Sequence, residues 1–137
     1  MLKPSFLNTL LFWFTKYIVF YVFMMIKNNN YALIRISELK TGEDWFYYLW
    51  MFLFLPLVAM LIFSVPLYLS FKAKSSVYFT VAVIAVFVAE FFIYTWLASQ
   101  ANLMNGIYNG IISVVFLMLF FYRYIKKFYQ EGELQKQ

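Results

Sequence analysis

The sequence predicts an all-α fold: a polytopic membrane protein built as a bundle of four transmembrane helices. Two observations predict it. The 137-residue chain is 65% hydrophobic and 12% charged, whereas an ordinary globular domain is about 45–50% apolar and about 25% charged. A bilayer-spanning helix needs ~20 mostly apolar residues, and the chain has room for four spans and little else. We therefore expect a single transmembrane domain over residues 1–137.

Scarce residue types exclude several classes of function. The chain has no Cys and no His, which excludes disulfides, thiolate nucleophiles, His metal ligands and Ser–His catalysis. Five of the six acids fall in predicted loops or in the tail, so a two-carboxylate or metal site inside the membrane would need several chains. We predict no catalytic residue, no metal site and no cofactor. The net charge of +5 comes mostly from Lys and Arg beside the predicted spans, which does not indicate nucleic-acid binding.

The first predicted span covers residues 6–26. A Lys followed by an apolar run is typical of a signal peptide, but Lys16 interrupts the run and no small-x-small cleavage site follows it. Lys16 costs about 2.5–3.5 kcal/mol on an insertion scale, and a dozen Leu, Ile, Val and Phe at about −0.3 to −0.6 kcal/mol each outweigh it. We expect this span to be retained.

The loop at residues 27–44 is the only substantial one. Residues 31–39 are weakly amphipathic, which is typical of either a short interfacial helix or an irregular strand. Thr41 and Asp44 form a T-x-x-D pattern, which predicts a capping box where the next helix begins.

The second predicted span covers residues 45–71 and begins with a cluster of Trp, Tyr and Phe typical of the water–lipid interface. At about 1.5 Å per residue it would rise about 40 Å, which exceeds the ~30 Å hydrocarbon core. Pro56 and Pro66 each remove a backbone donor, so we expect kinks there. A Pro kink either marks a hinge or sets helix shape, and we favour shape.

The third predicted span covers residues 77–98 and carries one carboxylate, Glu90, near its middle. An ionisable residue inside the membrane is a functional-site hypothesis by default. Ala82, Ala85 and Ala89 recur at i, i+3 and i+7, a narrow stripe that allows close packing with another helix. Glu90 flanks that stripe, so we expect it to face protein.

Lys16 and Glu90 form a candidate intramembrane charge pair. Along their predicted helices they lie about 15 Å and about 20 Å from the start, using the helical rise. The offset is about one turn, which a Lys side chain can cover. A neutralising pair would explain why both charges are tolerated. Two hypotheses remain: a packing pair without a transport role, which we favour, or a protonatable site in an ion path.

The fourth predicted span covers residues 107–122. Gly106 and Gly110 form a G-x-x-x-G at its entrance, which is typical of close helix packing but overlaps a turn-like M-N-G; both interpretations stay open. Three asparagines lie near this entrance: Asn102, Asn105 and Asn109. We expect them to be loop or helix-cap residues; the less favoured alternative is that they line an outer vestibule.

The tail, residues 123–137, is basic and amphipathic. On a helix, one side carries Arg123, Lys126 and Lys127, and the other carries Tyr122, Ile125 and Tyr129. Such a helix can lie on anionic lipid headgroups, with roughly 1 kcal/mol from each basic residue. The alternative, which we favour, is the ordinary positive flank of a last span.

Charge placement predicts the orientation. With both termini cytoplasmic, seven basic residues lie inside and three outside, which obeys the positive-inside rule. We expect an integral membrane protein, with a bacterial inner membrane as the default location. The inside set is Lys3, Lys72, Lys74, Arg123, Lys126, Lys127 and Lys136, and the outside set is Lys27, Arg35 and Lys40.

The function expected from these features is non-enzymatic. We expect a small membrane subunit that assembles with itself or with a partner membrane protein. The alternative is a small homo-oligomeric ion- or proton-coupled transporter, pore or membrane-targeting effector that uses Glu90 and Lys16. The expected partners are the lipid bilayer, anionic headgroups at the tail, and a second copy or another membrane protein.

Overall fold

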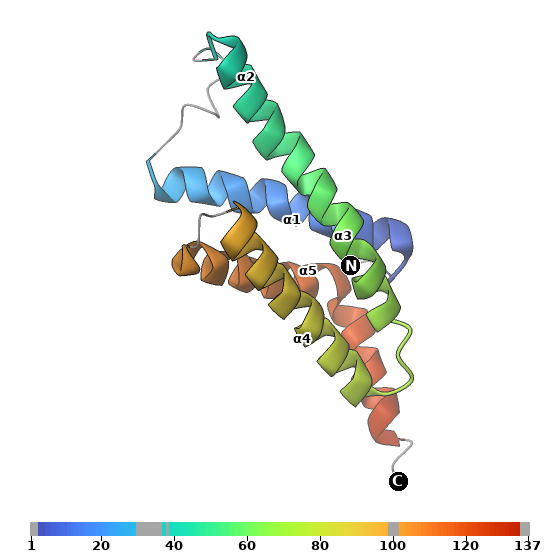
Figure 1. The fold of residues 1–137 in the computed structure, drawn as a ribbon. Helices are drawn as coiled ribbons and strands as arrows, with labels where there is room; N and C mark the ends of the chain where they lie inside the picture. Colours follow the sequence, from blue (N-terminus) through green and yellow to red (C-terminus); the bar gives the residue numbers. More distant parts are fainter. Residues whose placement is uncertain (1–2, 30–36, 38, 99–101, 135–137) are drawn as a thin grey trace.

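The computed structural model describes residues 3–29, 37, 39–98 and 102–134, and all of the regular structure in them is helical. The all-α prediction is therefore confirmed for this part of the chain. The predicted amphipathic stretch at 31–39 lies, apart from Ser37 and Leu39, outside the described residues. The elements in Figure 1 are α1 (Phe6–Lys27), α2 (Gly42–Leu49), η2 (Trp50–Phe54), α3 (Leu55–Ser70), α4 (Ser76–Ile93), η3 (Tyr94–Ala98) and α5 (Leu103–Leu134), where η marks π-helical turns.

Three helical stretches are long and apolar enough to cross a membrane. They are Phe6–Lys27, Ser76–Trp96 and Leu103–Gln130, which correspond to α1, α4 with most of η3, and most of α5. The fourth apolar helix, α3, has 16 residues. It continues α2 and η2 without a break in the chain, so the expected span at 45–71 is divided among three helical segments.

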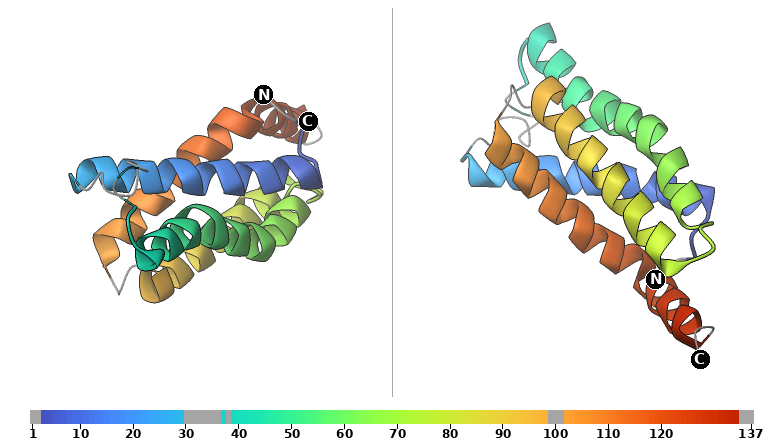
Figure 2. Two further views of the ribbon diagram at one scale, coloured as in Figure 1. Left: turned by 90° about the horizontal axis from the view of Figure 1, so that it is seen from above. Right: turned by 60° about the horizontal axis from the view of Figure 1, so that its bottom comes forward.

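The helices form a bundle in which chain neighbours pack side by side (Figures 1 and 2). Helix α1 packs against α3 and α5, and α4 packs against the same two helices. Among the described residues, the backbones of α1 and α4 do not approach each other closely. They therefore occupy diagonal positions. The start of α1, the α3–α4 turn and the end of α5 lie toward one end of the bundle.

The core is mostly aromatic. Trp13 of α1 packs against Phe63 of α3, with ring centroids 5.2 Å apart. Phe71, just after α3, packs against Phe121 of α5 at 4.8 Å. Aromatic pairs at these separations add about 0.5–1.5 kcal/mol beyond the area that they bury, so ring packing holds the helices together where the sequence offers few polar contacts.

Side-chain caps fix several helix starts, among them those of α2 and α4. The predicted capping box is confirmed: Thr41 Oγ1 accepts from the Asp44 N–H, and the Asp44 carboxylate accepts from the Thr41 N–H at 2.9 Å. Hydrogen bonds from the Thr41 hydroxyl and backbone hold the pKa of the Asp44 carboxyl below its ordinary value. At α4, the Ser75 hydroxyl accepts from the Tyr78 N–H. Each cap satisfies a donor that the first helical turn leaves free.

The two prolines have different surroundings. The π-helical turn η2 ends at Phe54, two residues before Pro56, and the Leu55 N–H reaches the Trp50 carbonyl. A π turn is one of the few causes of a change in helix direction, so the helix departs from α geometry just before Pro56; the kink expected at Pro56 stays a prediction. Around Pro66 the helix α3 runs on without interruption, and the Ser70 hydroxyl donates to the Pro66 carbonyl at 2.8 Å.

Helix α5 is longer at both ends than the predicted span at 107–122. It begins at Leu103 and continues to Leu134, so Gly106 and Gly110 lie inside a helix and the turn interpretation is wrong. The apolar side of the expected surface tail is divided. Tyr122 and Tyr129 are exposed, whereas Ile125 is buried. Beside it, the Tyr124 hydroxyl donates to the Phe71 carbonyl at 2.9 Å, so Tyr124 and Ile125 pack on the bundle.

The two glycines of α5 have opposite surroundings. A Cβ on Gly106 would overlap the Thr95 hydroxyl and lie 2.8 Å from a ring carbon of Phe91, whereas a Cβ on Gly110 would meet nothing within 4 Å. Of the two glycines, only Gly106 is needed for the close approach of α5 to the end of α4.

We expect Gly106→Ala to destabilise the protein by about 1–3 kcal/mol, because the added methyl overpacks a close helix contact. Gly110→Ala is the matched control, and we expect it to be neutral or slightly stabilising, since Ala favours a helix by about 1 kcal/mol over Gly. Thermal unfolding in detergent micelles measures both. Equal melting temperatures for the two variants would contradict the assignment.

Candidate functional site

Five side chains from three helices meet at the centre of the bundle. Lys16 and Tyr17 come from α1, Glu90 from α4, and Asn109 and Ser113 from α5. All but Tyr17 have an exposed fraction of 0%, and that of Tyr17 is 3%. We call this set the polar cluster. It is the candidate functional site because buried polar groups are costly unless they are partnered, and here they gather at one place.

The Glu90 carboxylate is the acceptor at the centre. Its Oε1 forms an ion pair with Lys16 Nζ and accepts from the Tyr17 hydroxyl and from Asn109 Nδ2, both at 2.9 Å. Its Oε2 accepts from the Ser113 hydroxyl at 2.8 Å. Both oxygens are therefore satisfied by residues of the same chain.

The Lys16 ammonium has both polar and aromatic neighbours. It donates to Glu90 Oε1 and to Asn109 Oδ1, and it lies 3.9 Å from the centroid of the Tyr17 ring, a cation–π distance. The Asn109 amide thus turns its oxygen toward the cation and its NH₂ group toward the anion. The reverse orientation would place like partial charges together, so the network fixes the amide.

The ion pair bridges the diagonal of the bundle. Helices α1 and α4 are not backbone neighbours in the described part of the chain, so their side chains meet only if at least one is long. Lys16 supplies that length. Asn109 and Ser113, which are one turn apart on α5, close the cluster from the side. The result ties α1, α4 and α5 to one relative register.

The sequence analysis did not place Tyr17, Asn109 or Ser113 beside Lys16 and Glu90. Asn109 was expected as a loop or cap residue, but it lies inside α5, because that helix begins at Leu103. Asn109 and Ser113 are spaced i, i+4, which places them on one helix face; that spacing could have identified them. Asn102 does act as a cap, since its Oδ1 accepts from the Asn105 N–H at 3.2 Å.

The other predicted residues lie away from the cluster. Ala82 is half-buried, while Ala85 and Ala89 are exposed on the outside of α4. Arg123, Lys126 and Lys127 are exposed on α5, close in the chain to Tyr124, whose hydroxyl reaches Phe71 at the end of α3.

The chemistry available to the polar cluster is electrostatic. It holds one cation and one anion, so its net charge is zero while Lys16 and Glu90 are both ionised. Within the described residues no group of three or more Asp, Glu, His or Cys could hold a metal ion. The arrangement can fix helix register by holding one buried carboxylate against one buried cation.

Comparison with known proteins adds no assignment: no family model, no curated protein and no solved structure matches this chain.

We expect Lys16→Leu to destabilise the protein by about 3–5 kcal/mol, because it leaves Glu90 as an uncompensated buried charge. The double variant Lys16→Leu with Glu90→Leu should recover part of that loss, since an apolar pair leaves no orphaned charge. Lys74→Leu, at an exposed position, is the control and should be nearly neutral. Chemical denaturation in micelles measures all of them. A double variant no more stable than Lys16→Leu would show that the pair is not coupled.

Proposed function

We propose that this protein is an integral membrane subunit that acts, without catalysis, by assembling with a second copy or with a partner membrane protein. In this proposal the chain crosses the bilayer four times. The helices α1, α4 and α5 are three spans, and the continuous run α2–η2–α3 is the fourth, because α3 alone has 16 residues.

The proposed assembly rests on the outward face of α4. Ala85 and Ala89 are exposed there among larger apolar side chains, while the adjoining face buries Glu90 and Val86 against the rest of the bundle. In lipid, helices associate through close van der Waals contact at small residues rather than through a hydrophobic driving force. Two small residues that the chain's own helices leave uncovered, Ala85 and Ala89, therefore favour contact with another membrane helix at that point.

The polar cluster supports assembly through apolar contacts. Lys16 and Glu90 are paired within one chain and are completely enclosed. No charge from the cluster faces outward to be satisfied by a neighbour, so a complete protomer is available as a building block.

The same enclosure gives the transport alternative less support. A homo-oligomeric pore or transporter would be expected to turn its charged residues toward a shared axis or a water path. Here Glu90 and Lys16 face the interior of a single protomer, so transport through them would need an opening motion of the bundle.

We also propose the orientation that the charge distribution predicts. The start of α1, the α3–α4 turn and the end of α5 lie toward one end of the bundle, and exposed basic residues gather there, among them Lys72, Lys74 and Arg123. The positive-inside rule favours the cytoplasmic side for this end, and anionic lipid headgroups would attract it. The bacterial inner membrane is the membrane we propose.

Native mass spectrometry of the protein, extracted gently from its own membrane, should show a homo-oligomer or a stoichiometric complex with another membrane protein. The physical reason is the pair of uncovered small residues on α4, Ala85 and Ala89. A protein that is found only as a monomer, in several mild detergents, would overturn the proposal.

Cross-linking locates the contact. Because the chain has no Cys, Ala85→Cys introduces a single thiol, which should cross-link to the neighbouring chain. Ile84→Cys is the matched control: Ile84 is also exposed, but consecutive helix positions point about 100° apart. Cross-linking of both variants to the same extent would indicate random collision.

Single thiols also test the orientation. We expect Asn28→Cys, just after α1, to react with a membrane-impermeant maleimide in intact cells, and Lys74→Cys, in the α3–α4 turn, to react only after lysis. Both positions are exposed in the structure, so protection reports the membrane and not burial. The reverse pattern would invert the topology.

A further inference from the structure

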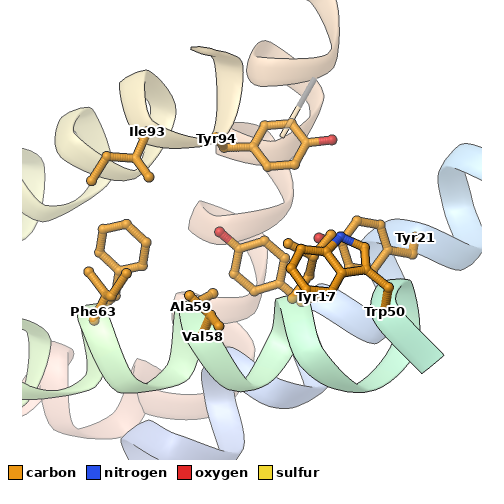
Figure 3. A pocket seen from close by; sticks show the side chains of 10 residues that line it. Tyr17, Tyr21, Trp50, Val58, Ala59, Phe63, Ile93 and Tyr94 are labelled. Atoms are coloured by element: carbon orange, nitrogen blue, oxygen red, sulfur yellow. The ribbon is translucent and has the colours of Figure 1, made fainter. Parts of the chain in front are cut away.

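A partly enclosed pocket of about 230 Å³ lies between α1, α3 and the end of α4, and its lining is mostly apolar. Figure 3 shows Ile93 and Tyr94 on one side and Val58 and Ala59 on the other. Tyr17 and Tyr21 of α1 also line it.

The pocket runs from an exposed rim to a buried floor. Its rim includes Val58, Ile62 and Ile93, which are exposed. Its floor includes Tyr17 and Tyr21, which are only 3% and 6% exposed. The rim residues lie on helices that the proposed topology places in the bilayer, so the opening faces lipid chains and not water.

Both π-helical turns among the described residues border this pocket. Trp50, the first residue of η2, and Tyr94, the first residue of η3, are both lining residues. The π-helix accounts for well under 1% of residues in globular proteins, and single π turns are frequent at functional sites. Two of them on opposite walls of one pocket indicate a shaped site rather than a packing defect.

The charge around the pocket selects the chemistry of its occupant. The charged side chains behind the floor are Lys16 and Glu90, and they neutralise each other. Tyr17 stands between them and the pocket: its hydroxyl donates to Glu90, and its ring lies against the Lys16 ammonium. A charged ligand would find no uncompensated counter-charge there, whereas an uncharged apolar group loses nothing on entry.

We propose that this pocket binds one hydrocarbon chain of a membrane lipid, which enters sideways from the bilayer between α3 and the end of α4. The lining is apolar, the rim opens where lipid chains are the solvent, and the surroundings carry no net charge. This proposal rests on the bilayer placement of the bundle and is independent of its assembly.

Photolabelling tests the proposal directly. The full-length protein is reconstituted in phosphatidylcholine vesicles that contain a small fraction of phosphatidylcholine with a diazirine in one acyl chain. After irradiation, mass spectrometry should find adducts on Tyr17 or Tyr21. These residues are buried from the protein surface, so only a chain inside the pocket can reach them. Adducts on exposed Ile111 and Val114 of α5 report bilayer placement separately.

Two matched variants locate the entrance. Val58→Trp fills the rim and should abolish the adducts on Tyr17 and Tyr21 while those on Ile111 remain. Val65→Trp is the control, because Val65 lies two turns further along α3, is equally exposed (48% against 47%) and is not a lining residue. If Val58→Trp does not fold, Ile62→Trp fills the same rim.

The outcomes separate the two proposals. Adducts on Ile111 and Val114 without any on Tyr17 or Tyr21 would leave the bilayer placement intact and overturn the lipid-chain site. Pocket adducts that persist equally in Val58→Trp and Val65→Trp would overturn it as well. Absence of adducts from all four positions would overturn the bilayer placement and the site together.

Discussion

The structure depends on the buried ion pair between Lys16 and Glu90. Removing two charges from water costs several kcal/mol for each ion, and only close pairing with further hydrogen bonds offsets this cost. Asn109 and Ser113 supply such bonds from α5. A rotation or slip of α1 or α4 would leave a charge without its partner, and one of α5 would remove the hydrogen bonds of Asn109 and Ser113. The pair therefore constrains the arrangement of the helices more than it adds to the free energy of unfolding.

The features that could be predicted from the sequence are those that depend on local composition. Apolar length identifies α1, α4 and α5 as helices long enough to span a bilayer, and the regular rise of a helix places Lys16 and Glu90 at similar depths. Asn109 and Ser113 could not be assigned in the same way. Their participation depends on where α5 begins and on its rotation about its axis. Asn102 caps the start of the helix, and Gly106 allows its close approach to Thr95 and Phe91; both are tertiary or capping contacts that composition does not show.

The predicted end of the fourth span at residue 122 is not the end of helix α5, for a related reason. Arg123 ends the apolar run, but it does not end the helix, because Tyr124 and Ile125 on the other side still pack against the bundle. An apolar run measures what lipid accepts, whereas a helix continues as long as one face has neighbours. The π turns η2 and η3 could not be predicted from the sequence either, since nothing in the local composition specifies a wider helical turn.

Tyr17 joins the two sites of the molecule. It lines the pocket, donates to Glu90 and lies against Lys16. Any movement of the Tyr17 side chain would therefore change the pocket wall and its contacts with Glu90 and Lys16 together. If a lipid chain fills the pocket, it holds the Tyr17 ring in the position from which the hydroxyl reaches Glu90. Pocket occupancy and an intact ion pair would then favour each other, and by linkage the preference is reciprocal. Lipid bound at the edge of the bundle would in this way stabilise the register at its centre.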